Sequence, residues 1–156
     1  MRLLPLPLLV VWLTACATEV PASTDAGASV SCHKDPRVVA WQPGLQVQST
    51  DGSAKLQFVA ADPSPPARDT TNVWRVRLSQ ASGLPLAEDT TVTLAPFMPD
   101  HGHGSMSAPQ AEAKGKGEWQ LAPVNLFMPG VWRFTVTALP TGGAPLTFVW
   151  HLCIDG

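Results

Sequence analysis

The sequence predicts an all-β fold in which two antiparallel sheets, with seven to eight short strands in total, pack face to face. Sixteen prolines in 156 residues interrupt the chain at short intervals. No window repeats apolar residues at the three- and four-residue spacing of a helix. Several runs instead alternate apolar and polar residues, which gives each strand one dry face.

Eight runs carry this strand pattern. In chain order, strands are expected at residues 45–49, 56–60, 74–79, 90–96, 110–114, 118–121, 132–138 and 146–152. Turns rich in glycine and proline separate the runs, and Gly115-Lys116-Gly117 marks a hairpin between two of them. Strands of this length and spacing are typical of a sandwich.

The chain has six tryptophans and no tyrosine. Trp74, Trp132 and Trp150 lie on apolar strand faces, so their indoles are expected in the core. Trp41 and Trp119 are also assigned to packing, with shielding of a metal site from water as the alternative.

The amino terminus has the pattern of a secretory signal. Met1-Arg2 precedes an apolar run over residues 3–13, which is far shorter than the roughly 20 residues that span a bilayer. The tetrapeptide Leu13-Thr14-Ala15-Cys16 resembles a bacterial lipobox, which implies a signal peptide at residues 1–15 and acylation of Cys16. The resemblance places the protein in the bacterial cell envelope, anchored to the membrane by lipid.

Residues 16–31 are small and polar, as in a flexible tether, and the folded domain is expected at residues 32–156. Ala17 follows the lipobox cysteine where an aspartate would signal retention in the inner membrane. Attachment to the outer membrane, facing the periplasm or the cell surface, is therefore expected. A domain of this size has room for one hydrophobic core.

Charge and motifs exclude some functions. The formal charge is −2, and the few basic residues are scattered, so nucleic acid is not an expected partner. The chain has no Gly-x-Ser-x-Gly elbow, no phosphate-binding glycine loop and no His-Glu-x-x-His motif. An enzyme is therefore not predicted.

With Cys16 acylated, the other two of the three cysteines, Cys32 and Cys153, form an even pair that frames the domain. In an oxidising compartment this pair predicts a disulfide. The alternative is a structural zinc site, because Cys32 and His33 together with His151 and Cys153 supply two thiols and two imidazoles.

Soft metal donors gather in one nine-residue segment, at residues 98–106. It holds two of the four methionines, Met98 and Met106, and two of the four histidines, His101 and His103. Met128 lies before another strand and could meet this segment at one end of a sandwich. Thioethers favour Cu(I), while imidazoles accept Cu(I) or Cu(II), so these five residues predict a copper site. The alternative is a flexible polar loop with methionines filling gaps in the core.

Two segments carry a family resemblance. Residues 97–104 (Phe-Met-Pro-Asp-His-Gly-His-Gly) and residues 127–136 (Phe-Met-Pro-Gly-Val-Trp-Arg-Phe-Thr-Val) resemble the YtkA-like and FixH-like domains of bacterial envelope proteins. The resemblance loosely covers residues 45–154. It implies a small immunoglobulin-like β-sandwich, in a family of which some members are linked to copper delivery. The cysteine pair at 32 and 153 departs from the family pattern.

Two functions follow as hypotheses. The first is an envelope lipoprotein that binds copper through the His/Met segment and passes it to an acceptor protein or otherwise handles it. The second is a metal-free module that binds another envelope protein.

Overall fold

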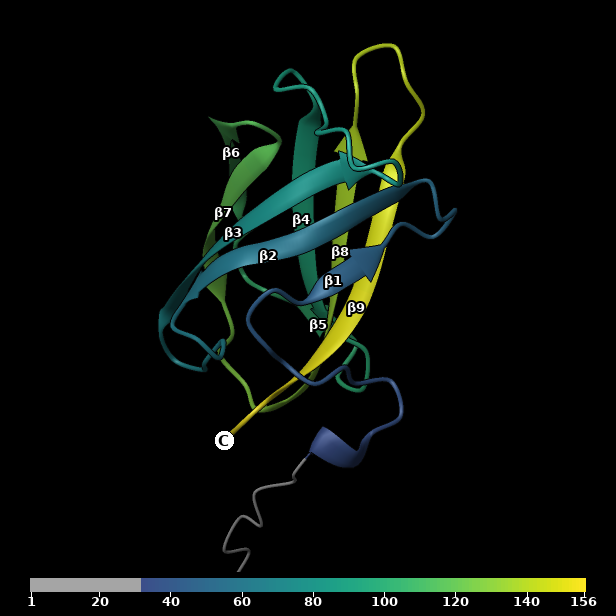
Figure 1. Cartoon of the computed structure of the whole chain (residues 1–156). Helices are drawn as coiled ribbons and strands as arrows, with labels where there is room; N and C mark the ends of the chain where they lie inside the picture. The colour runs from purple at the N-terminus through teal and green to yellow at the C-terminus, as the bar shows by residue number, and fades with distance from the viewer. Residues whose placement is uncertain (1–31) are drawn as a thin grey trace, which may run out of the picture.

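The computed structural model describes residues 32–156, which form two antiparallel β-sheets packed face to face (Figure 1). The all-β sandwich prediction is confirmed. The described chain has nine strands, one more than the upper prediction: β1 (Gln46–Gln48), β2 (Ala54–Asp62), β3 (Thr71–Gln80), β4 (Thr91–Met98), β5 (His103–Gly104), β6 (Gln110–Gly115), β7 (Glu118–Asn125), β8 (Gly130–Leu139) and β9 (Leu146–Ile154). The unexpected strand is β5, which has two residues inside the segment predicted as a loop.

One sheet has the order β1-β2-β3-β7-β6 and the other β5-β4-β8-β9. Every second residue is buried from Asn72 to Leu78 in β3 and from Trp132 to Ala138 in β8, as the alternating sequence predicts. The two buried faces meet between the sheets and form one core.

Aromatic rings fill the centre of this core. Trp74 lies edge-on to Phe58 and Phe134, and Trp150 stacks on Phe134 with a centroid distance of 5.4 Å. Trp119 is 2% exposed, which confirms its assignment to packing. Trp41 is half-buried, packs against the core and lies edge-on to Phe58, so its assignment to packing is confirmed as well.

The residues on either side of β1 cover the free edge of β9, Val39 before the strand and Thr50 after it. The Val39 amide donates to the His151 carbonyl at 3.0 Å, and the Thr50 amide donates to the Thr147 carbonyl at 2.8 Å. Covering a sheet edge in this way protects it from pairing with another chain.

The part of the chain before β1 is also joined to β9 covalently. Cys32, the first residue of the short 3-10 helix η1 (Cys32–Lys34), forms the predicted disulfide with Cys153 across a Cα–Cα distance of 5.3 Å. The bond closes a loop over a sequence separation of 121. It brings the start of the described chain to the same end of the sandwich as the carboxyl terminus (Figure 1).

The predicted signal peptide at residues 1–15, the lipidation site Cys16 and the tether at residues 16–31 lie outside the described residues. Within residues 32–156, no helix has the length and apolar character needed to cross a membrane.

Candidate metal site

The predicted site segment is a tight turn between β4 and β5. The amides of His101 and Gly102 both donate to the Met98 carbonyl, at 3.2 and 2.9 Å. Gly102 has φ +72°, a conformation that L side chains rarely adopt. At Gly104 a Cβ atom would lie 2.9 Å from the Pro96 carbonyl oxygen, so a side chain there would push the turn away from β4.

The turn brings the two histidines together. The ring centroids of His101 and His103 are 5.7 Å apart, with the planes at 75°. His101 is exposed, whereas His103 is half-buried and stacks on Phe127 at 5.5 Å. The His103 Nδ1 lies 3.3 Å from the Gly104 carbonyl oxygen. When Nδ1 donates this hydrogen bond, Nε2 keeps its lone pair for a metal.

The loop between β7 and β8 meets this turn, as the sequence predicted. The Ser105 hydroxyl donates to the Asn125 carbonyl at 3.0 Å, and Phe127 supports His103. The Met98 side chain reaches the same loop, because its Cε atom lies 3.2 Å from where a Cβ of Gly130 would be. Two loops far apart in the sequence therefore form one surface.

The three predicted thioether residues lie in different environments. Met98 is 1% exposed and pairs with His103 across β4 and β5, so their side chains lie on the same face of the sheet. Met128 is half-buried and packs against the core, and its carbonyl accepts a 2.9 Å hydrogen bond from the Trp132 indole. Met106 is 93% exposed and is not packed with the others. The structure thus places the rings of His101 and His103 next to each other and pairs Met98 with His103 across the two strands.

Asp100, in the same turn, is held by an arginine that the sequence analysis did not connect with it. Both terminal nitrogens of Arg37 donate to the Asp100 carboxylate, at 2.8 and 2.7 Å. Arg37 also binds Asp35, whose pKa these hydrogen bonds lower to about 2. Arg37 likewise lowers the pKa of Asp100. The turn is therefore tied to the segment that follows η1.

The disulfide contradicts the alternative zinc site of Cys32, His33, His151 and Cys153. Cys32 and Cys153 are joined in the disulfide, so neither offers a thiolate. His151 lies across from Arg133 on β8, and burial together with Arg37 and Arg133 lowers the pKa of its imidazole. The donors that do lie close to Cys153 belong to His33 and Asp155.

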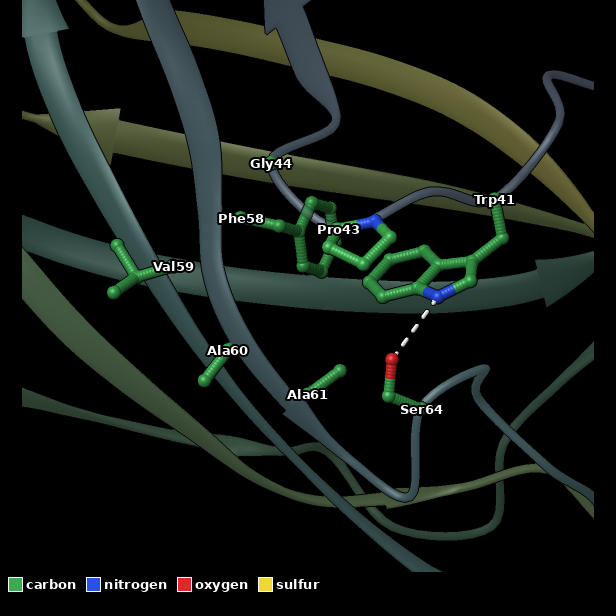
Figure 2. Close-up of a pocket in the computed structure, with 8 residues that line it drawn as sticks. All are labelled: Trp41, Pro43, Gly44, Phe58, Val59, Ala60, Ala61 and Ser64. Atoms are coloured by element: carbon green, nitrogen blue, oxygen red, sulfur yellow. Dashed lines mark hydrogen bonds between the residues drawn. The ribbon is translucent and has the colours of Figure 1, made fainter.

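A separate hollow lies on the five-stranded sheet, with a volume of about 150 Å³ (Figure 2). Its polar contact is a 3.3 Å hydrogen bond from the Trp41 indole to the Ser64 hydroxyl. The lining has no titratable or sulfur-containing side chain, which makes it unsuited to a metal: Trp41, Pro43, Gly44, Phe58, Val59, Ala60, Ala61 and Ser64.

Comparison with known families decides the classification. The model of the YtkA-like family matches residues 50–137. The chain belongs to the YtkA-like family. The matched YtkA-like region includes the turn between β4 and β5 and the loop before β8, but neither cysteine of the disulfide. The FixH-like resemblance stays a prediction. No curated protein and no solved structure matches the chain significantly.

Proposed function

We propose that this YtkA-like protein binds copper at the turn between β4 and β5. His101 and His103 are the principal ligands, Met98 supplies a thioether, and Met128 and Met106 are secondary candidates. The observation that carries the proposal is the pair of imidazoles with centroids 5.7 Å apart, beside a buried methionine on the same sheet face as His103.

The donor types favour copper over harder ions. Imidazole and thioether form a set of borderline and soft ligands, whereas Mg²⁺ and Ca²⁺ prefer oxygen. The nearest carboxylate, Asp100, is engaged by Arg37 and is not free to bind a hard cation. The stacking of His103 on Phe127 limits the rotation of its ring, which lowers the entropy lost when a metal binds.

The double variant His101→Ala/His103→Ala is expected to weaken copper binding by more than about 10-fold, because it removes the two imidazole ligands. The measurement is calorimetric titration of the oxidised full chain with Cu(I) and with Cu(II). The double variant His33→Ala/His151→Ala is a matched control, since it removes the same number of histidines and should keep the affinity. Equal copper affinity in the wild type and the His101/His103 variant would leave the metal-free interaction module as the function.

Met98→Leu separates the two oxidation states. Leucine fills a similar buried volume without a sulfur, so the free energy of unfolding should fall by less than about 1.5 kcal/mol. If Met98 is a ligand, the affinity for Cu(I) falls more than the affinity for Cu(II), because thioethers favour the softer ion. An unchanged ratio of the two affinities would remove Met98 from the ligand set.

We further propose that Cys16 anchors the protein to a membrane of the bacterial envelope. Its support is the lipobox-like tetrapeptide at residues 13–16. The wild-type chain, expressed in bacteria fed with a labelled fatty acid, should incorporate the label, and Cys16→Ser should lose it completely. Cys32→Ser is the control and should keep the label. Labelling that persists in Cys16→Ser would contradict the anchor.

A further inference from the structure

A second group of metal-ligand side chains surrounds the disulfide. The His33 Nε2 lies 2.8 Å from the Asp155 Oδ1, and the same oxygen lies 4.0 Å from the Cys153 Sγ. The donor atoms of His33, Cys153 and Asp155 all lie within 4.8 Å of one another. The 3-10 turn of η1 places His33 here, because it lets the residue after Cys32 point to the same side as the disulfide.

We propose that reduction of the Cys32–Cys153 disulfide creates a zinc site formed by Cys32, Cys153, His33 and Asp155. Two thiolates, one imidazole and one carboxylate are the ligand types and the number that Zn²⁺ takes in tetrahedral sites. The Cys153 sulfur already lies among these donors. The Cys32 sulfur is bonded to it and the two Cα atoms are 5.3 Å apart, so the Cys32 thiolate can turn toward the same group once the bond opens.

The oxidised protein lacks this site for a chemical reason. Disulfide sulfur carries no negative charge, and the thiolate is the form of cysteine that binds metal. In the oxidised protein His33 and Asp155 bind each other, with 56% and 75% of their side chains exposed. A single exposed pair of this kind holds a cation weakly.

The Cys32–Cys153 disulfide opens by thiol–disulfide exchange with a dithiol reductant. A reductant thiolate attacks one cysteine sulfur and releases the other cysteine as a thiolate. The second thiolate of the reductant then attacks the reductant sulfur of the mixed disulfide and releases the first cysteine. The protein gains two electrons and two protons as two thiols, and the reductant leaves as a disulfide. Binding of Zn²⁺ then releases the two thiol protons as the thiolates form.

Zinc fits this group better than copper does. Two thiolates satisfy Cu(I), and a carboxylate oxygen adds little for so soft an ion. Zn²⁺ uses all four donors, so its affinity should depend on His33 and Asp155. The site is separate from the copper site, which has imidazoles and thioethers but no thiol.

The test uses the full chain in mild detergent with Cys16→Ser and His101→Ala/His103→Ala. These changes leave Cys32 and Cys153 as the thiols and remove the copper-site histidines, so failure here and failure of the copper proposal are distinguishable. The chain is reduced with a phosphine and titrated with Zn²⁺ against a chromophoric chelator. Tryptophan fluorescence reports folding, and Ellman's reagent reports thiol reactivity.

The reduced chain should bind a single Zn²⁺ at least about 10-fold more tightly than the oxidised chain, with both thiols protected from Ellman's reagent. His33→Gln and Asp155→Asn should each weaken binding by at least about 10-fold. Asp89→Asn, an exposed carboxylate before β4 at the opposite end of the sandwich, should have no effect.

Three results would overturn the proposal. One is equal zinc affinity in the oxidised and reduced chains. Another is a zinc affinity that His33→Gln and Asp155→Asn leave unchanged, as expected of a Cu(I)-preferring site formed by the thiolates alone. The third is a reduced chain that stays unfolded with or without zinc, whereas folding that zinc restores would support the site.

Discussion

Replacing Trp132 by alanine is expected to lower the free energy of unfolding by about 3–5 kcal/mol, the usual cost of removing a fully buried large aromatic side chain. Trp132 is 0% exposed. Its indole donates a 2.9 Å hydrogen bond to the Met128 carbonyl and lies edge-on to Phe127 at 5.6 Å. Chemical denaturation followed by circular dichroism measures the loss.

The same substitution should also weaken copper binding, because Phe127 and Met128 lose the side chain that supports them. Trp74→Ala is the matched control, because Trp74 is equally buried. Its ring contacts are with Phe58, Phe134 and Trp150, and not with the loop between β7 and β8. We expect a similar loss of stability in both variants and a loss of copper affinity in Trp132→Ala alone. Equal copper affinities, measured where both variants are folded, would show that the loop does not depend on Trp132.

Removing the disulfide with Cys32→Ser/Cys153→Ser is expected to cost up to about 4–5 kcal/mol, because the bond closes a loop over a sequence separation of 121. Measured losses for such bonds start near 2 kcal/mol, because the reduced unfolded chain retains structure. The measurement is denaturant unfolding of the oxidised wild type against the double variant.

Wild type treated with a phosphine in the presence of a zinc chelator should match the double variant. A further check is hydrogen exchange at the Val39 and Thr50 amides, which bind the β9 edge. Both should exchange faster once the covalent link is lost. An unchanged free energy of unfolding in the double variant would mean that the core alone holds the residues around β1 against β9.

Most of the fold could be predicted because it depends on alternation along single strands. The runs around Trp74, Trp132 and Trp150 each placed their indoles in the core, as observed. The strand β5 was missed, because two residues, one of them glycine, carry no alternation. Its pairing with β4 is decided by the tight turn at Gly102.

The candidate site was less predictable, because its contacts join distant parts of the chain. Arg37 reaches Asp100 across 63 positions, and neither residue carries a local signal of the pairing. The sequence grouped Met106 with Met98, yet one is 93% and the other 1% exposed. Nearness in the sequence shows which donors share a turn, but not which way their side chains point.

The disulfide also determines where an anchored protein would carry its load. If Cys16 is acylated as proposed, the chain would enter the sandwich at Cys32, and a pull from the bilayer would pass into β9 through the disulfide. Arg37 and Asp100 link the histidine turn to this end, so the turn would lie at the end of the domain from which the anchored chain leaves.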